Sequence, residues 1–142
     1  MFFSVLNYGC ETWTWNKTMR SRVDAFEMWC YRRMLKISWK DKVSNKEVLK
    51  RAQAVLHFRK DMTKRKMEYG GHVMRGSSGE TQLNILEGKI PGERVRGRPR
   101  LTWIDDIKKW TGIKTYGEIK RTAEDRKRWK SIVVNLLIED DK

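Results

Sequence analysis

The amino-acid sequence predicts a mainly α-helical protein, a small assembly of about five or six helices in two halves with a basic Gly/Pro loop. Apolar residues recur every three or four positions along several segments, which is the period of an amphipathic helix. Residues that favour helix N-termini precede these segments, and glycine and proline gather between them. Together these observations indicate helices joined by turns, without a sheet.

The first long helix is expected at Lys17–Ile37. Asn16 is a suitable N-cap, because its side chain can accept a hydrogen bond from a free backbone N–H of the first turn. Before it, Met1–Leu6 is apolar and is expected to be a truncated strand or helix that packs poorly. The apolar stripe of the helix consists of Met19, Val23, Phe26, Cys30, Met34 and Ile37.

Two more helices are expected in the first half of the chain. Ser44 and Glu47 have capping-box spacing, in which each side chain bonds the backbone N–H of the other, and they predict a helix at Asn45–Ala52. The next helix is expected at Val55–Tyr69, with the pair Gly70-Gly71 as its stop. The segment Gly76–Gly79 follows and has the composition of a flexible linker.

The second half contains four further helical segments. A short one is expected at Thr81–Glu87, and another starts at Trp103 and stops at Gly112. A third is expected at Thr115–Arg121 and the last at Ala123–Leu137. The apolar face of the last one consists of Trp129, Ile132, Val133, Leu136 and Leu137. We therefore divide the chain into a helical region at 1–75, a flexible linker with a basic loop at 76–100 and a C-terminal helical region at 101–142.

The net charge favours a polyanionic partner. Thirty-two Lys and Arg residues face 18 Asp and Glu residues, which leaves +14. The excess is spread over the four segments Met19–Arg33, Arg59–Lys66, Lys89–Arg100 and Lys120–Lys130. Such an excess predicts affinity for nucleic acid, although membrane-surface proteins share this composition.

The loop Gly88–Arg100 is the strongest candidate for a binding site. It contains both prolines and carries five cations against the single carboxylate of Glu93. Pro99 disfavours helix at Arg98, so the loop is expected to present its guanidinium groups to phosphates, with Trp103 anchoring it to the next helix. A solvated hinge is the alternative. The predicted nucleic-acid-binding residues are Lys89, Arg94, Arg96, Gly97, Arg98 and Arg100.

The segment Arg96-Gly97-Arg98-Pro99 is also similar to the core of AT-hook peptides, which lie in the narrow minor groove of A·T-rich DNA. That similarity implies groove insertion. Generic phosphate contact and a purely structural turn remain open.

Residues for catalysis or metal binding are not apparent. Cys10, Cys30, His57 and His72 lack the spacing of a zinc site, and both thiols are expected to be reduced and buried. Asp105 and Asp106 are adjacent in a predicted helix, so their side chains point about 100° apart and do not converge on one ion. We expect no cofactor and no metal. Without a signal peptide or apolar span, the chain is expected to be intracellular, nuclear or cytoplasmic, and not secreted or membrane-bound.

The segment Tyr8-Gly9-Cys10-Glu11-Thr12-Trp13 resembles the YGxETW signature that follows the palm in reverse transcriptases of LINE-like (non-LTR) retrotransposons. Further segments are similar to this family in the same order, from about residue 3 to residue 134. They are Phe26–Leu35, Gly71–Arg75, Ile85–Gly92, Gly97–Arg100 with Trp103–Asp106, and Asp125–Trp129.

This resemblance implies that the chain is the thumb-side and C-terminal part of an endonuclease–reverse transcriptase, with 1–75 as its thumb-like region. The parent family is an RNA-directed DNA polymerase that needs Mg²⁺, but its palm aspartates are absent from this sequence. The implied role is non-catalytic contact with template–primer or target DNA, through DNA or RNA as partner. The family signature residues carried over are Tyr8, Gly9, Glu11 and Trp13.

Two other interpretations remain open. The chain is a residual truncated reading frame without independent function, or it is an interaction module that docks on the palm of its parent enzyme through Trp13, Trp15 and Phe26. The family also places an aromatic pair where this chain has Tyr69-Gly70, which is expected to weaken the end of the third helix.

Overall fold

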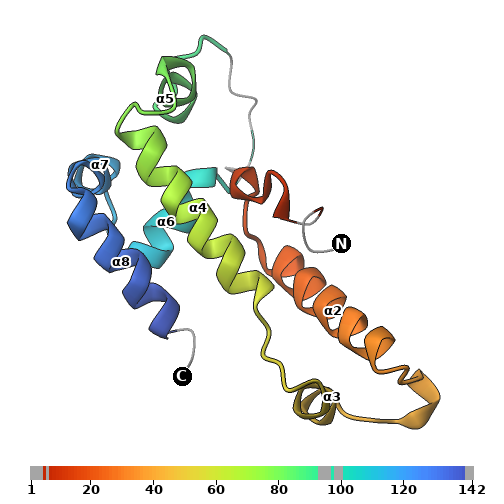
Figure 1. Cartoon of the computed structure of the whole chain (residues 1–142). Coiled ribbons are helices and arrows are strands. Elements are labelled where there is room, and N and C mark those ends of the chain that lie inside the picture. The colour runs from red at the N-terminus through yellow and green to blue at the C-terminus, as the bar shows by residue number, and fades with distance from the viewer. Residues whose placement is uncertain (1–4, 6, 93–96, 98–100, 140–142) are drawn as a thin grey trace. The chain divides into compact units, whose positions relative to one another are not determined.

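The computed structural model describes residues 5, 7–92, 97 and 101–139 (Figure 1). Within these residues it contains helices and no strand, which confirms the mainly α prediction. The described residues form seven α-helices, where about five or six were expected. Val5 is helical and exposed, and the rest of the Met1–Leu6 prediction lies outside the described residues. The elements are η1 Cys10–Thr12, α2 Lys17–Met34, η2 Trp39–Asp41, α3 Asn45–Ala52, α4 Phe58–Met74, α5 Glu80–Leu86, α6 Trp103–Thr111, α7 Tyr116–Glu124 and α8 Arg126–Glu139.

The chain forms two compact units, which are described separately below. The small unit is Trp15–Asp61, and the large unit combines Met1–Thr14 with Met62–Lys142. The division into 1–75, 76–100 and 101–142 remains a prediction.

In the small unit, local signals determine the ends of α2. The Asn16 side chain accepts a hydrogen bond from the Met19 N–H at 2.7 Å, which confirms the predicted N-cap. The helix ends at Met34, one turn before the predicted Ile37, because Lys36 adopts a left-handed conformation with φ of 54°. The Ile37 N–H then bonds the Arg32 carbonyl, which is the Schellman ending of a helix.

The core of the small unit lies between α2 and α3. Met28, Tyr31 and Val48 are buried there, and partly buried apolar residues pack around them. The buried carboxylate of Glu27 accepts hydrogen bonds from the backbone N–H groups of His57 (2.7 Å) and Phe58 (3.2 Å). These N–H groups lie at the start of α4, so Glu27 caps that helix from α2.

Helix α3 spans the predicted residues, but only half of its capping box forms. The Ser44 hydroxyl accepts a hydrogen bond from the Glu47 N–H at 3.3 Å, as expected. The Glu47 carboxylate instead pairs with Arg51 one turn later, at 3.0 Å. The second bond of the capping box, from the Ser44 N–H to the Glu47 carboxylate, is therefore replaced by an ion pair within the helix.

Helix α4 corrects the prediction that Gly70-Gly71 stops the third helix. The helix runs through both glycines to Met74 and ends in a Schellman turn at Gly76. The two glycines serve packing: a Cβ on Gly70 would lie 2.7 Å from the Ile107 side chain, and one on Gly71 would lie 2.6 Å from Trp129 Nε1. Both distances are shorter than real Cβ contacts. At Gly71 the neighbour is a ring held by a hydrogen bond, so glycine there lets α8 approach α4 closely, whereas the end of the Ile107 side chain beside Gly70 can move.

The core of the large unit joins α4, α6, α7 and α8, which lie side by side in Figure 1. Its buried side chains are Met67, Met74, Ile107, Ile119, Ala123, Trp129 and Val133. The last helix begins at Arg126, not at the predicted Ala123, which belongs to α7. The break occurs because the Asp125 carboxylate caps α8, accepting bonds from the N–H groups of Lys127 (3.0 Å) and Arg128 (3.1 Å).

Candidate nucleic-acid interface

Most of the predicted basic loop is outside the described residues. Arg94, Arg96, Arg98 and Arg100 belong to this undescribed part, so their contacts remain predictions. Gly97 is described and has φ of 148°, a conformation that side chains rarely adopt, with open space around it. At this position the backbone itself favours glycine.

Lys89 is described and has a protein partner. Its Nζ lies 2.6 Å from Glu87 Oε2, while Lys120 Nζ and the Tyr116 hydroxyl bond Glu87 Oε1 at 2.6 and 3.2 Å. The hydrogen bonds from Lys120 and then Lys89 lower the pKa of Glu87 to about 2. The charge of Lys89 is thus compensated within the protein, and Glu87 links the end of α5 to α7.

The residues of the YGxETW-like signature form a turn that is attached through its backbone. Gly9 has φ of 67°, and Tyr8 beside it is 88% exposed. The carbonyl of Trp13 accepts a hydrogen bond from Lys66 Nζ at 2.7 Å, and the carbonyl of Glu11 accepts one from Trp103 Nε1 at 2.8 Å. These two hydrogen bonds attach the turn to α4 and α6.

The charges of Lys66 and Asp106 are buried in the large unit. Lys66 Nζ lies 2.5 Å from Asp106 Oδ2, and neither side chain is more than 2% exposed. The same ammonium lies 5.0 Å from the centre of the Trp103 ring and 5.7 Å from that of Trp110. The sequence does not predict this pair, because an ion pair across 40 positions leaves no local pattern.

Asp105 and Asp106 face different partners, as predicted from their adjacency. Asp105 forms a capping box with Thr102, whose N–H donates to Asp105 Oδ2 at 2.7 Å, and this bonding lowers the pKa of Asp105. Among the described residues, no three His, Cys, Asp or Glu side chains are grouped so that they could hold a metal ion. Cys10 and Cys30 are buried free thiols, and burial raises the pKa of each.

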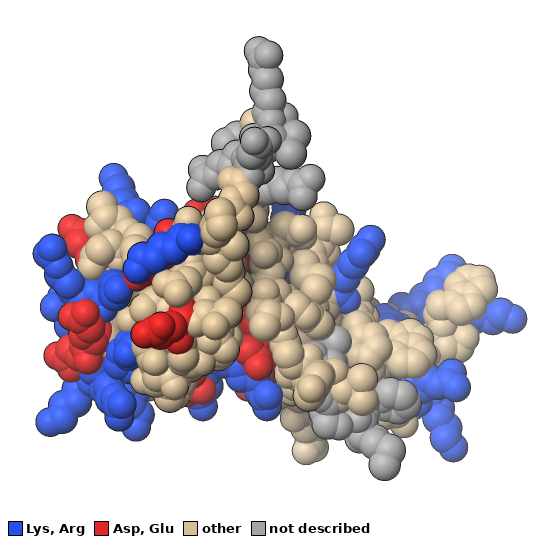
Figure 2. All heavy atoms as spheres, turned by 90° about the horizontal axis from the view of Figure 1, so that it is seen from above, with Lys and Arg blue, Asp and Glu red and all other residues tan. Residues whose placement is uncertain are grey.

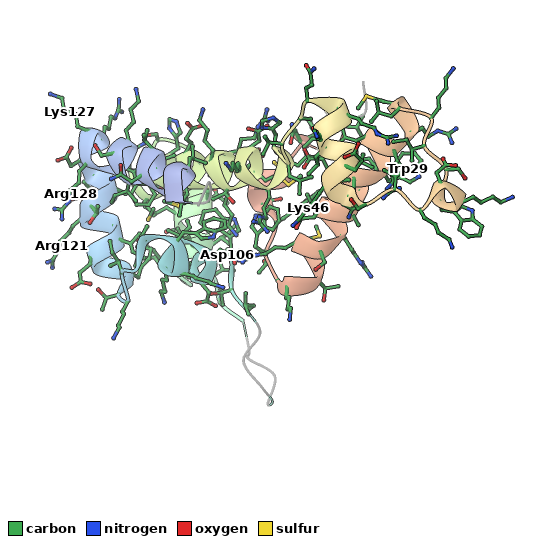
Figure 3. The ribbon with its side chains drawn as sticks, turned by 90° about the horizontal axis from the view of Figure 1, so that it is seen from below. Trp29, Lys46, Asp106, Arg121, Lys127 and Arg128 are labelled. Atoms are coloured by element: carbon green, nitrogen blue, oxygen red, sulfur yellow. The ribbon has the colours of Figure 1, made fainter. Side chains whose placement is uncertain are left out.

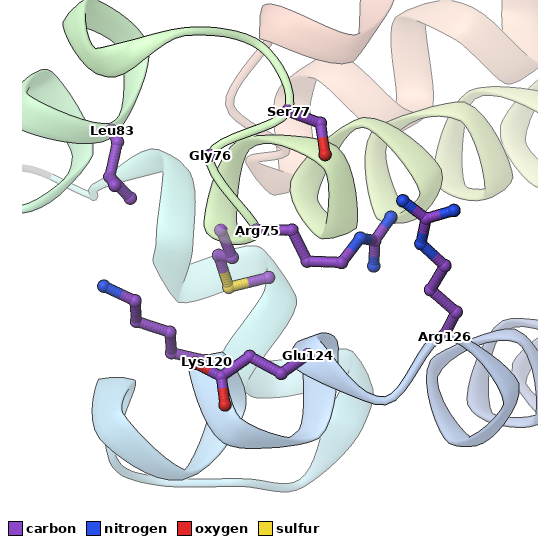
Figure 4. Close-up of a pocket in the computed structure, with 8 residues that line it drawn as sticks. Arg75, Gly76, Ser77, Leu83, Lys120, Glu124 and Arg126 are labelled. Atoms are coloured by element: carbon purple, nitrogen blue, oxygen red, sulfur yellow. The ribbon is translucent and has the colours of Figure 1, made fainter.

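A basic pocket lies where the end of α4 meets α7 and the start of α8 (Figure 4). Its volume is about 500 Å³. The residues that line it are Met74, Arg75, Gly76, Ser77, Leu83, Lys120, Glu124 and Arg126. Three cations and one carboxylate therefore surround the same cavity.

Two guanidinium groups face each other across this pocket (Figure 4). Arg75 donates one hydrogen bond to the Ala123 carbonyl at 2.7 Å, while its Nε is buried without a hydrogen-bond partner in the described structure. Burial and then the positive charge of Arg126 lower the pKa of Arg75. Like charges held this close favour an anion between them.

The start of α8 adds to this positive charge. Its first turn contains Arg126, Lys127 and Arg128 and no acidic residue, although the positive end of a helix dipole disfavours cations there. Figure 3 shows Lys127, Arg128 and Arg121 of α7 on the same side of these two helices, pointing away from the core. We call Arg75, Arg121, Arg126, Lys127 and Arg128 the basic corner.

Only part of the basic corner can be predicted from the sequence. The charged run Lys120–Lys130 contains four of its five residues, but Arg75 precedes Arg126 by about 50 positions and no local pattern connects them. The three successive cations after Asp125 are the sequence feature that indicates this site. On the face that Figure 2 shows, further Lys and Arg side chains are scattered among uncharged residues, with Asp and Glu interspersed.

No described helix has both the length and the apolar character needed to cross a membrane.

The comparisons with known proteins indicate an origin in a mobile element. No protein-family profile and no solved structure matches the chain significantly. The chain is 29% identical, over 140 residues, to a Caenorhabditis elegans protein described as uncharacterized and transposon-derived. The alignment covers 90% of this chain and 49% of that protein, so the chain spans about half the length of its relative. The similarity links this sequence to a transposable element.

Proposed function

We propose that this chain is the non-catalytic, nucleic-acid-binding C-terminal part of a LINE-like reverse transcriptase, and that it contacts template–primer or target DNA inside the cell. The similarity to a transposon-derived protein supports the mobile-element origin. The collinear resemblance to the thumb-side part of reverse transcriptases supports the more specific assignment. The net charge of +14 supports a polyanionic partner.

The basic corner is the observation that carries the proposal. Cations in the first turn of α8 oppose the helix dipole, and Arg75 and Arg126 repel each other, although the Asp125 carboxylate and the Ala123 carbonyl accept hydrogen bonds there. Phosphate groups would relieve both kinds of repulsion. Guanidinium groups also bind phosphate oxygens in a bidentate manner, which lysine cannot do.

A catalytic role is not part of the proposal. The aspartates of a polymerase palm are missing from this sequence. Asp105 and Asp106 cap a helix and pair with Lys66, respectively, so they do not form a metal-binding pair. Polymerase chemistry and its Mg²⁺ would belong to the palm of the parent enzyme.

Salt-dependent binding to duplex DNA tests the role of the basic corner. Replacing Lys127 and Arg128 together by alanine removes two phosphate contacts, and the slope of log affinity against log salt is expected to flatten by about 1.8. The matched control replaces Lys46 and Lys50, two exposed cations of α3, and should leave the slope nearly unchanged. If the Lys127/Arg128 variant binds like wild type at every salt concentration, the basic corner does not contact the DNA phosphates.

The basic loop is tested in the same way. Replacing Arg96 and Arg98 by alanine should flatten the slope by about two. An AT-hook mode further requires preference for A·T-rich duplex, lost in Gly97→Val, because a β-branched residue fits neither φ of 148° nor the groove floor. A lower slope without A·T preference would leave phosphate contact as the role of the loop.

The alternative interpretations predict different results. Docking on a palm requires accessible aromatic residues, but Trp15 is only 2% exposed. A chain that fails to fold in isolation and recovers only on co-expression with a palm would support docking. A chain that folds under no condition would support a residual reading frame.

A further inference from the structure

The turn between α2 and α3 of the small unit (Figure 1) contains an exposed tryptophan. Trp39 starts the 3-10 helix η2 and is 82% exposed. Its neighbours in the chain behave differently: Ile37 and Val43, on either side of the turn, pack against the core of the unit. The turn is thus attached at both ends, while its largest apolar side chain remains in solvent.

Several interactions hold this turn in one conformation. The Ser38 N–H donates to Asp41 Oδ2 at 2.7 Å, and the Ser38 hydroxyl accepts from the Lys40 N–H at 3.3 Å. One Arg32 nitrogen donates to the Val43 carbonyl at 2.7 Å and to Asn45 at 2.9 Å. The exposed indole is therefore presented on an ordered backbone, which lowers the entropic cost of binding.

The backbone of the turn is strained at two lysines. Lys36 and Lys42 have φ of 54° and 49°, in the left-handed region where glycine or asparagine is normally found. Lysine at both positions adds positive charge, but it has a higher backbone conformational energy there than glycine would have. Lys36 ends α2 and Lys42 ends η2, so these two left-handed residues fix the backbone on either side of Trp39.

The charges around Trp39 indicate the chemistry of a ligand. Lys36, Lys40 and Lys42 are all exposed, and the only carboxylate of the turn, Asp41, is engaged by the Ser38 N–H. Proteins that bind single-stranded nucleic acid combine such cations with exposed aromatic rings, on which unpaired bases stack. In a duplex the faces of the bases are covered by the neighbouring base pairs, so they are not available for stacking on a side chain.

We propose that the Trp39 turn is a stacking platform for an unpaired nucleobase, with Lys36, Lys40 and Lys42 contacting the flanking phosphates. The proposal rests on the proposed function and deepens it, because it names single-stranded nucleic acid as the ligand of the small unit. An acidic protein or an anionic membrane would use the lysines without needing base stacking.

The test compares Trp39→Ala with Trp39→Phe in the full chain. The probes are fluorescent oligo-dT and oligo-U of roughly 12 nucleotides, the size of a typical single-strand site, an abasic oligonucleotide of the same length, and a duplex. Trp39→Ala should weaken binding to oligo-dT and oligo-U by about 5- to 150-fold, as expected for loss of one stacked base, and Trp39→Phe should recover part of it. Binding to the abasic oligonucleotide and the duplex should not change.

Controls separate the possible failures. Met34→Ala, which removes another exposed apolar side chain of the small unit, should bind like wild type. Unchanged oligo-dT binding by Trp39→Ala, or an equal loss for the abasic strand, would overturn the stacking platform while leaving the proposed function intact. Loss of binding to vesicles of anionic lipid but not to oligo-dT would indicate a membrane ligand and also overturn it. If wild type binds neither strand nor duplex, the proposed function itself fails.

Discussion

Gly71 of α4 offers a sharp test of how the large unit is packed. An alanine Cβ at this position would lie 2.6 Å from Trp129 Nε1, 2.8 Å from Trp129 Cδ1 and 2.9 Å from an Arg75 nitrogen. The indole cannot withdraw easily, because its N–H donates to the Met67 carbonyl at 2.9 Å. Any relief of the clash therefore breaks a buried hydrogen bond or shifts α8 away from α4.

Two opposing effects determine the size of the change. In the interior of an ordinary helix, alanine is more stable than glycine by about 0.8–1.0 kcal/mol. Forcing an extra carbon into a filled core costs about 1–3 kcal/mol, and three contacts below 3.0 Å place Gly71 at the upper end. We expect Gly71→Ala to lower the free energy of unfolding by about 2 kcal/mol.

Urea unfolding followed by tryptophan fluorescence and far-UV circular dichroism measures this change. Gly117→Ala is the matched control, since Gly117 lies in α7 where an added Cβ would have no packing neighbour within 4 Å, and it should raise stability by about 0.5 kcal/mol. Adding Trp129→Phe to Gly71→Ala should recover part of the loss. Gly71→Ala as stable as wild type would refute the close packing of α4 and α8.

Three further predictions concern stability. Lys66→Met should lower the free energy of unfolding in urea by about 3–5 kcal/mol, because the buried Asp106 carboxylate loses the Lys66 ammonium, and adding Asp106→Leu should restore most of it. Burial and then the Glu87 carboxylate raise the pKa of Tyr116 to about 12, above its ordinary 10.0. The contribution of this group to stability is therefore full below pH 10 and is lost as the pH rises towards 12, so the alkaline loss of stability should be smaller in Tyr116→Phe. Lys36→Gly should raise stability by about 1 kcal/mol by removing left-handed strain, as chemical unfolding would show.

Local sequence signals predicted the parts of the fold that local forces determine. Asn16, Ser44 and Thr115 each cap the helix that was expected to follow, because an N-cap needs only a side-chain oxygen and the next backbone N–H groups. The apolar face of α8 was also predicted correctly, since periodicity reports burial directly.

Tertiary contacts explain what the sequence could not predict. Gly70-Gly71 was expected to stop a helix, and only the presence of α6 and α8 shows that it lets helices pack closely. The pocket at Arg75 joins residues from four helices, and the burial of Lys66 depends on a partner in α6. For the same reason, the sequence did not show that Trp39 is exposed.

The cations at the start of α8 also bear on how long the protein survives in a cell. Repulsion among them weakens a helix that carries much of the core, so dissolved salt, which screens charges within about 10 Å at 0.1 M, should strengthen the fold. A bound polyanion would do so further by mass action. Because changes of about 1–2 kcal/mol alter cellular abundance several-fold, molecules without a ligand would be the first that proteases remove.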